Sequence, residues 1–291
     1  MNPFSKTYTE DTTDEILIRQ VLEGDKKALS DLLKSHQAFV YNVAWKMTGN
    51  PTDAEDLSQE AFIKIITNLS KFKFQSSFRT WAYRIVVNHF LNDKKKAQKM
   101  FANNFEELGM QLDAAPDAEM TPFEKEEKRE LTKEVRLQCL SGMVLCLTKE
   151  QRLVYIIGDI FGGDHNIGAE ILDISKANFR MKLAKARKDL YNFMDNKCGL
   201  VDQANPCRCH KKVKAAVEGK MIDAKNLLHN KKEYATFQSY IGEDADFLTG
   251  DAEMKYAALQ QDLTFKKDFD KKNFIEEILD DNNWKSKLNL N

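Results

Sequence analysis

The chain has 291 residues, and its 44 Lys and Arg nearly balance its 45 Asp and Glu, which leaves a formal net charge of −1. Hydrophobic residues make up 42% and charged residues 31%, with only 12 Gly and five Pro, so the composition favours a globular helical protein over a turn-rich β fold. No apolar run is long enough to cross a bilayer, the N-terminus lacks a signal-peptide core, and five cysteines, an odd number, do not suit a disulfide framework. These features predict a cytoplasmic protein without membrane insertion.

The first 70 residues predict three amphipathic helices. After a polar start, apolar residues recur at helical spacing over about 14–23, 26–48 and 53–69. Glycines near 24 and 49 end the first two helices, and Thr52 or Asp53 is expected to cap the third. The outer face of the third helix is acidic.

The next stretch, residues 71–99, interleaves aromatic residues with Lys and Arg. Unpaired bases stack on aromatic faces, each contact contributing about 1–3 kcal/mol, while cations hold the flanking phosphates. The pattern is therefore typical of a surface that binds a melted DNA strand. The competing interpretation places most of these rings in the core, because Ile85, Val86 and Leu91 continue an apolar helical face. Trp81 and Phe90 are expected to be mainly structural.

The segment after residue 100 is acidic. Ten acids and four bases between 105 and 134 give a net charge of −6, and two prolines occur without any sustained apolar period. This composition predicts a flexible acidic linker over 101–122. A helix is expected to begin near Phe123, and Cys139 and Cys146 are expected to be small core residues because their neighbours are apolar.

Residues 149–190 predict a compact helix-turn-helix. The first helix has one apolar face and is broken at Gly162-Gly163, and Ser175 is expected to cap the last helix, over about 175–194. Between 174 and 190 six cations oppose one acid, a net charge of +5. A helix of that charge behind a short turn suits entry into a DNA major groove with phosphates on both sides. The competing interpretation is an ordinary solvated surface helix.

These motifs together resemble the sigma-70 family, specifically the extracytoplasmic-function group of RNA polymerase initiation factors. DAEDLSQEAF at 53–62 is similar to the polymerase-docking helix, and FRTWAYRIVVNHFLNDKKK at 78–96 is similar to the −10 module. LTKEQRLVYIIGDIFGG and IGAEILDISKANFRMKLAKARKDL resemble the −35-reading helix-turn-helix. The resemblance implies an all-α fold with a sigma2-like domain at 14–100, the acidic linker at 101–122, a sigma4-like domain at 123–196 and a helical, regulatory C-terminal extension at 197–291.

The resemblance also implies partners. The acidic helix would dock on the clamp helices of the largest polymerase subunit, with the polymerase flap as a second contact, and charge pairing there would add specificity and association rate more than affinity. The expected docking residues are Asp53, Asp56, Leu57, Gln59, Glu60 and Phe62. An anti-sigma factor is a further expected partner.

Promoter DNA is the other implied partner. A flipped −10 base would be captured by a pocket, which offsets an unpairing cost of a few kcal/mol. The expected −10 residues are Lys73, Phe74, Ser76, Ser77, Phe78, Arg79, Trp81, Arg84, Asn88, Lys94 and Lys95. The expected −35 residues are Ser175, Lys176, Asn178 and Arg180 near the helix start, with Lys182, Lys185 and Arg187 positioned for phosphates.

Two stretches of the helix-turn-helix depart from the family pattern. Asp164-His165-Asn166 stands where the family usually has a Ser or Thr and a Tyr followed by acids. Ala177-Asn178-Phe179 stands where a small residue, Thr and Val are common. These departures affect which promoter sequence is read, and Phe179 is expected only to repack the core.

The C-terminal extension begins with a cysteine-rich stretch. Cys198, Cys207, Cys209 and His210 lie within thirteen residues, and thiolates with an imidazole suit zinc or copper. The spacing differs from that of common zinc sites, so a loop with free thiols is the competing interpretation. Further along the extension, an amphipathic basic helix is expected over 211–230, and two or three helices are expected within 233–291, around 252–263 and 271–283. No cofactor is required for the implied function.

The sequence therefore predicts a sigma factor that directs promoter recognition and transcription initiation. The alternative is a free-standing helix-turn-helix regulator, which would have no use for a melting module joined to a docking helix. An enzyme is not expected, because no phosphate-cradling glycine loop and no nucleophile–base constellation is present.

Overall fold

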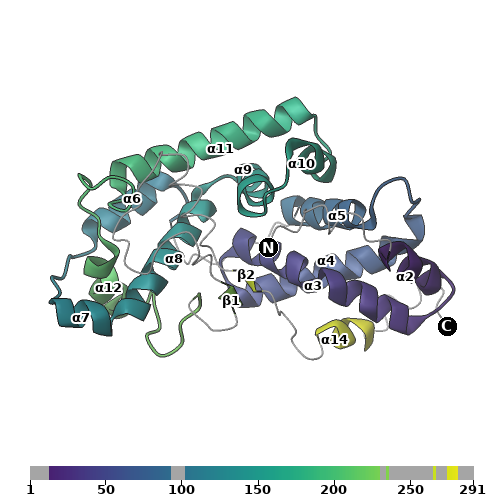
Figure 1. Cartoon of the computed structure of the whole chain (residues 1–291), viewed down its shortest axis with the longest axis horizontal. Coiled ribbons are helices and arrows are strands. Elements are labelled where there is room, and N and C mark those ends of the chain that lie inside the picture. Colours follow the sequence, from purple (N-terminus) through teal and green to yellow (C-terminus); the bar gives the residue numbers. More distant parts are fainter. Residues whose placement is uncertain (1–12, 93–101, 230–233, 236–264, 267–273, 281–291) are drawn as a thin grey trace. The chain divides into compact units, whose positions relative to one another are not determined.

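The structure, a computed structural model, describes residues 13–92, 102–229, 234–235, 265–266 and 274–280. These residues are almost entirely helical, which confirms the predicted all-α class (Figure 1). Within the described ranges the only strands are β1 (Tyr234–Ala235) and β2 (Phe265–Lys266), which pair antiparallel. Every described helix is either too short or too polar to cross a membrane.

The described residues form two compact units, each made of segments distant in the sequence. The first contains helices α2 to α5, the segment 156–182 and helix α14. The second contains helices α6 to α9, the segment that follows residue 183 and helix α12. This division differs from the predicted one, because the expected sigma4-like range 123–196 contributes to both units.

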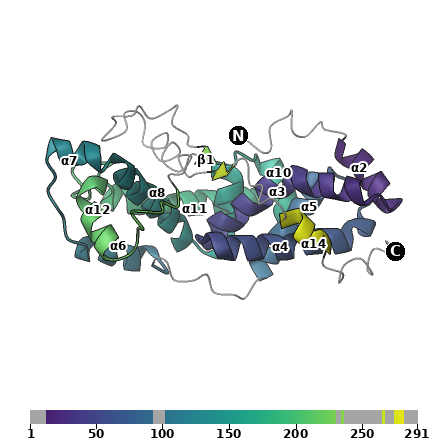
Figure 2. The same ribbon diagram turned by 90° about the horizontal axis from the view of Figure 1, so that it is seen from below.

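The first unit is built on three consecutive helices: α2 (Thr13–Leu22), α3 (Lys26–Thr48) and α4 (Pro51–Asn68). Gly49 ends α3 with a left-handed φ of 71°, a conformation that glycine adopts without steric cost. Asn50, and not the expected Thr52 or Asp53, caps α4, because its side-chain oxygen accepts hydrogen bonds from the backbone N–H groups of both. α3 and α4 lie side by side in both views (Figures 1 and 2).

A 3₁₀ turn, η1 (Leu69–Lys71), leads into a loop and then into α5 (Phe78–Asn92), which packs on α4. Helix α14 (Phe274–Asp280), which falls within the range 271–283 where a helix was expected, buries Ile275 and Ile278 and packs on α3 and α4 (Figure 2). The other helix expected in the C-terminal extension, at 252–263, lies outside the described residues. The core of the unit is formed by fully or nearly fully buried side chains, among them Ile18, Leu29, Leu32, Val40, Phe62, Ile65, Tyr83 and Phe90.

The turn of the predicted helix-turn-helix also belongs to this unit. A π-helical turn, η2 (Ile156–Ile160), precedes Phe161, whose buried ring lies 5.3 Å from the ring of Phe39. Helix α10 (His165–Leu172) packs on α5. Burial of Phe161 and packing of α10 explain why this segment joins the N-terminal helices and not the rest of the expected sigma4-like domain.

Helix α11 (Lys176–Lys197) begins as predicted, because the Ser175 hydroxyl accepts a hydrogen bond from the backbone N–H of Asn178 at 3.1 Å. Phe179 is fully buried and lies directly over Gly168 of α10. A Cβ at Gly168 would fall 2.2 Å from the Phe179 ring, so glycine is required at this helix crossing. This pair fixes how closely α10 and α11 approach.

In the second unit, the range expected as a flexible linker contains a helix. α6 (Phe105–Ala114) is capped by Asn104, and its ring Phe105 lies 5.2 Å from that of Phe193. Its acidic surroundings are neutralised by lysines from distant sequence: Lys197 bonds Asp113, Lys211 bonds Glu119 and Lys212 bonds Asp117. The expectation of a structureless linker fails because self-repulsion of the acids, which would extend a free chain, is cancelled by these cations.

The rest of the second unit packs around α8 (Arg129–Cys146), which follows α7 (Pro122–Glu127) and precedes α9 (Lys149–Tyr155). Leu137, Leu140 and Met143 of α8 are buried. Helix α12 (Cys209–Glu218) packs on α8 (Figure 1). It is shorter than the helix expected over 211–230, because Lys220 adopts a left-handed φ of 56° and the chain turns there.

Candidate polymerase and nucleic-acid interfaces

The acidic surface predicted to dock on the polymerase lies on the outer side of α4. Asp56 is exposed, and Asp53, Gln59 and Glu60 are half-buried. Two residues of the predicted set point inward and do not contribute: Leu57 is 6% exposed and Phe62 has no exposed surface. Their apolar side chains face the core because α4 is amphipathic, so fewer residues of the predicted set are exposed than expected.

Glu60 is also engaged within the protein. Its carboxylate lies 3.3 Å from Nε2 of His89, a nearly buried residue of α5. This contact ties α4 to α5 beside the acidic residues of α4. It leaves Asp56 as the most exposed acidic side chain of the predicted set.

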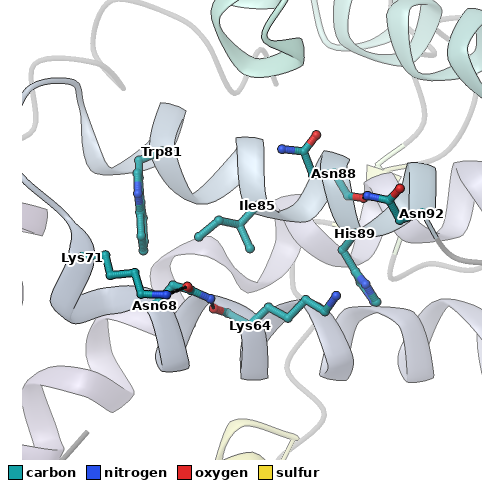
Figure 3. A pocket seen from close by; sticks show the side chains of 8 residues that line it. All are labelled: Lys64, Asn68, Lys71, Trp81, Ile85, Asn88, His89 and Asn92. Atoms are coloured by element: carbon teal, nitrogen blue, oxygen red, sulfur yellow. Dashed lines mark hydrogen bonds between the residues drawn. The ribbon is translucent and has the colours of Figure 1, made fainter. Parts of the chain in front are cut away.

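An open cavity of about 290 Å³ lies between α4 and α5, and His89 forms part of its lining. In Figure 3, Trp81 and Ile85 point from α5 toward Asn68 and Lys71 on the neighbouring segment. The volume is near the lower end of the roughly 300–1,000 Å³ typical of small-molecule sites, and suits a group the size of one base. The cavity is lined by Lys64, Asn68, Lys71, Trp81, Ile85, Asn88, His89 and Asn92.

The lining combines one aromatic ring, two lysines and three amides. Lys71 donates a hydrogen bond to Asn68 at 2.9 Å, and Asn68 donates to the Lys64 carbonyl at 2.8 Å, so these side chains are held in place. Asn88 is exposed, and its side-chain amide has no hydrogen bond within the described residues. Asn92 donates a hydrogen bond to the Asn88 carbonyl at 2.8 Å, so Asn88 is the lining amide open to a ligand. An aromatic face, an open amide and cations are the groups that bind an unstacked base and its phosphates.

Of the eight lining residues, only Trp81 and Asn88 were among the predicted −10 residues. The spacing of the other lining residues in the sequence could have identified them. Lys64, Asn68 and Lys71 recur at intervals of four and three, and residues 81, 85, 88 and 92 repeat the same helical interval. Each set marks one helix face, but the sequence does not tell that the two faces meet.

The aromatic residues of the preceding loop are mostly structural. Phe72 and Phe78 are buried, and their rings lie 5.4 and 5.7 Å from that of Trp81, so they support the wall of the cavity. Phe78, which was predicted to contact DNA, is therefore a buried structural residue. Phe74 is half-buried with a left-handed φ of 55°, and the Arg19 guanidinium lies 4.6 Å from its ring centre.

The polar loop residues are more accessible. Lys73 and Ser77 are exposed and Ser76 is half-buried. The Ser77 hydroxyl accepts a hydrogen bond from the backbone N–H of Thr80 at 3.2 Å, which caps the start of α5. Lys94 and Lys95 lie outside the described residues.

Arg79 does not face solvent, which corrects its predicted role in DNA contact. Its guanidinium lies 3.8 Å from the buried carboxylate of Asp14, which also contacts Nε2 of His36 at 3.2 Å. The Tyr83 hydroxyl approaches the other ring nitrogen of His36 at 3.5 Å. A buried charge needs such partners, so Arg79 joins α5 to α2 and α3 and is held in the core.

Arg84, on the same helix, is half-exposed and contacts the helix-turn-helix. Its Nε and Nη2 donate hydrogen bonds to the Glu170 carbonyl at 3.0 and 2.7 Å, and Nη2 lies 3.8 Å from the Asp173 carboxylate. Of the predicted −10 residues on α5, therefore, Trp81, Arg84 and Asn88 are the ones with exposed surface.

The predicted −35 residues lie on the cationic side of α11. Ser175, Lys176, Arg180, Lys185 and Arg187 are exposed, and Asn178 and Lys182 are half-buried. The shorter helix before the turn is capped by Asp164, whose carboxylate accepts hydrogen bonds from Asn166 and Ile167. These bonds, the one from Ile167 above all, hold the pKa of Asp164 below its usual value.

Comparison with known proteins agrees with this geometry. The family model of Sigma-70 region 2 matches residues 32–100, which hold the acidic surface of α4 and the whole cavity. The ECF RNA polymerase sigma factor SigW of Bacillus subtilis is 39% identical over 71 residues, or 24% of this chain and 38% of its own length. The ECF RNA polymerase sigma-E factor of Escherichia coli K12 is 27% identical over 193 residues, or 63% of this chain and 95% of its own length.

Residues 32–100 thus match Sigma-70 region 2, and the chain is similar to extracytoplasmic-function RNA polymerase sigma factors.

Among solved structures, CnrH in complex with the cytosolic domain of CnrY aligns with a TM-score of 0.44 and 20% identity, covering 63% of this chain and 97% of that one. The match to Sigma-70 region 2 ends before the helix-turn-helix and the C-terminal extension.

The cysteines of the extension lie in the second unit. The backbones of Cys198 and Cys207 form an isolated parallel β-bridge, and both thiols are free. Cys209 is the first residue of α12. His210, predicted to join them, is the second residue of α12. Within the described residues, no three His, Cys, Asp or Glu side chains are already arranged to hold a metal ion.

Proposed function

We propose that this chain directs promoter recognition and transcription initiation as a dissociable subunit of RNA polymerase, without catalytic activity of its own. The observation that carries the proposal is the cavity between α4 and α5 beside an acidic docking surface, both within the segment that matches Sigma-70 region 2. A free-standing helix-turn-helix regulator would need neither feature. The function places the chain in the cytoplasm with core polymerase.

The acidic surface of α4 would bind the clamp helices of the largest polymerase subunit. Asp56 would lead the contact, with Asp53, Gln59 and Glu60 beside it, because Asp56 is the exposed one. Opposite charges across such an interface accelerate encounter and fix its register. The helix-turn-helix would contact the flap of the polymerase.

The cavity would take one base flipped out of the −10 element. Trp81 offers a ring for stacking, Asn88 offers an amide for the edge of the base, and Lys64 and Lys71 would hold adjacent phosphates. Flipping costs a few kcal/mol, and stacking with hydrogen bonding is of comparable size. The free energy gained when the cavity binds the base can therefore offset the cost of flipping that base out of the duplex.

The cationic side of α11 would read the −35 element. Asn178 and Arg180 stand near the start of the helix, where side chains reach base edges, and Lys185 and Arg187 would contact phosphates. Occlusion of these surfaces by an anti-sigma factor is the form of control that the similarity to this family suggests.

The decisive experiment pairs docking with initiation. Core polymerase is incubated with the protein, recovered, and used for run-off transcription on genomic fragments. Asp56→Arg should abolish co-purification and transcripts, whereas Asp31→Arg, the same change of charge at an exposed position of α3, should affect neither. Specific DNA binding without any association with polymerase would support the free-standing regulator instead.

A second variant tests the cavity. Asn88→Ala should leave polymerase binding intact and reduce open-complex formation by up to about tenfold, because a hydrogen bond to the base of about 0.5–1.5 kcal/mol is lost. Fluorescence of 2-aminopurine placed in the −10 region measures the opening. Gln20→Ala, which removes an exposed amide from α2, is the control. Equal opening by both variants would contradict the assignment of the cavity.

A further inference from the structure

A row of aromatic rings connects the wall of the cavity to the surface of α2. The ring of Phe72 lies 5.4 Å from that of Trp81, which lines the cavity, and 4.7 Å from that of Phe74. The row ends at Arg19 of α2, an exposed residue whose guanidinium lies 4.6 Å from the centre of the Phe74 ring. All four residues belong to the first unit. A cation on the surface of α2 is therefore linked to the cavity through consecutive ring contacts.

Phe74 is the strained member of this row. Its φ of 55° lies in the left-handed region, where the Cβ of any residue other than glycine is crowded by its own backbone. An aromatic residue keeps such a conformation only when its surroundings hold it there. The half-buried ring of Phe74 has the buried Phe72 beside it and the Arg19 guanidinium over it. These two contacts oppose relaxation of the loop to an ordinary backbone conformation.

Trp81 has a second support that does not depend on Arg19. The ring of Phe78 lies 5.7 Å from that of Trp81 and 5.3 Å from that of His36. Phe78 and His36 are both buried, so this side of Trp81 is fixed by the packed core. The contact with Phe72, by contrast, leads through Phe74 to an exposed side chain. It is the side of the cavity wall whose position can change.

The position of Phe72 also affects a cation of the cavity. Lys71, the last residue of η1, directly precedes Phe72, and Lys71 and Trp81 lie at the same end of the cavity (Figure 3). The N–H of Phe72 donates a hydrogen bond to the Leu69 carbonyl at 3.0 Å, which ties Phe72 to this turn. A displacement of Phe72 would therefore move both the ring that stacks on a base and a lysine that holds a phosphate.

We propose that Arg19 is a positioning residue for the cavity. By holding Phe74 in its left-handed conformation, it keeps Phe72 and the cavity wall in the arrangement that receives a flipped base. This role rests on the proposed function of the cavity. It adds a residue outside the segment that matches Sigma-70 region 2, because that match begins at residue 32. It also differs from the direct contact with DNA that the sequence predicted for Phe74.

The strength of the contact between Arg19 and Phe74 sets the size of the effect. A contact can shift the population of the receptive conformation by no more than its own free energy. A cation over an aromatic ring at an exposed site contributes about 0.5–1 kcal/mol, which corresponds to a change of about two- to fivefold in an equilibrium.

The first test measures promoter opening by core polymerase loaded with the full-length protein, using 2-aminopurine fluorescence in the −10 region. Arg19→Ala should reduce opening about two- to fivefold, and Arg19→Lys, which keeps a cation, should retain most of it. Lys27→Ala removes the same charge from an exposed position of α3 and should leave opening unchanged. Co-purification with polymerase should be the same for all three variants. Opening by Arg19→Ala at the wild-type level would overturn the assignment.

Salt dependence separates positioning from direct binding of DNA by Arg19. The logarithm of affinity falls with the logarithm of salt concentration, and each phosphate contact on a single strand contributes about 0.7 to the slope. Arg19→Ala should weaken binding to a promoter fragment with unpaired −10 bases without changing this slope. A slope that becomes shallower by this amount would show that Arg19 contacts a phosphate and would overturn the positioning role.

A double variant tests the route through Phe74. Phe74→Leu removes the ring and should reduce opening about as much as Arg19→Ala. The two changes together should add little to either alone, because both remove the same contact. Additive losses would mean that Arg19 acts independently of Phe74, contrary to the proposed role.

A spectroscopic readout in the free protein needs neither polymerase nor DNA. In protein labelled with 5-fluorotryptophan, the ¹⁹F resonance of Trp81, assigned by its loss in Trp81→Phe, should shift in Arg19→Ala and stay in place in Lys27→Ala. A shift without any opening by the wild-type protein would support the positioning of Trp81 and contradict the function proposed for the cavity. An unchanged resonance with normal wild-type opening would overturn only the role of Arg19.

Discussion

Arg84 of α5 donates two hydrogen bonds to the main-chain carbonyl of Glu170, at 3.0 and 2.7 Å. Glu170 lies in the last turn of α10, where carbonyls carry partial negative charge, and its carbonyl also accepts a hydrogen bond from the Asp173 N–H at 3.4 Å. A guanidinium is well suited to that position because its two donors are parallel. The residue proposed to meet −10 DNA therefore also holds α10 against α5 within the first unit.

Arg84→Ala should loosen α10 in the free protein. The bonds are solvent-exposed, so the expected loss is about 1 kcal/mol or less, seen as faster hydrogen exchange of amides 165–172. Arg84→Lys should be intermediate, since a single ammonium cannot form both parallel bonds. Lys73→Ala, at an exposed loop position, is the control, and identical exchange in all variants would contradict the role of the contact.

Gly168→Ala should destabilise the helix-turn-helix despite the better helix propensity of alanine. The added Cβ would lie 2.2 Å from Cε2 and 2.3 Å from Cζ of Phe179, an aromatic ring that is 1% exposed and cannot move away freely. Overpacking of this kind costs about 1–3 kcal/mol, more than the roughly 1 kcal/mol gained from propensity. Urea denaturation measures the change.

A double variant makes the cause specific. Adding Phe179→Leu to Gly168→Ala should recover part of the lost stability, because the smaller side chain leaves room for the new methyl group. If the two changes are simply additive, the steric explanation is wrong.

Asp164 should give α10 a pH-dependent contribution to stability. Its folded pKa is lowered, mainly by the hydrogen bond from Ile167, so the contribution is present above the unfolded value of about 3.8 and is lost as the pH falls through the folded pKa. Asp164→Ala should cost about 1 kcal/mol at neutral pH. Asp164→Asn should keep the cap but lose this acid dependence. In the wild-type protein, the chemical shift of the Asp164 carboxyl in an NMR titration measures the folded pKa.

Glu134 should hold the end of the described C-terminal segment to α8. Its side chain is fully buried and accepts hydrogen bonds from the backbone N–H of Leu228 at 2.8 Å and of His229 at 3.0 Å. Glu134→Ala should leave those donors unsatisfied, at a cost of about 1–3 kcal/mol, and speed hydrogen exchange at 222–229. Glu130→Ala, on the exposed side of the same helix, should change neither quantity.

Local features of the fold could be predicted from neighbouring residues. Gly49 ends α3 where expected, Ser175 caps α11 as expected, and α5 runs through the predicted aromatic stretch. These depend on interactions within a few residues, such as left-handed backbone at glycine or a side-chain cap, which sequence patterns report directly. The acidic face of α4 and the cationic face of α11 follow for the same reason.

What the sequence by itself determined was therefore the helices, their charged faces and the family resemblance. Only the tertiary structure decided that Phe62, Phe78 and Arg79 are buried, since either face of an amphipathic helix can be read as a surface until its partner is known. The acidic segment at 105–119 forms ion pairs with Lys197, Lys211 and Lys212. These ion pairs and the burial of the three side chains depend on contacts between residues far apart in the chain, and no local pattern encodes which distant charges or faces will meet.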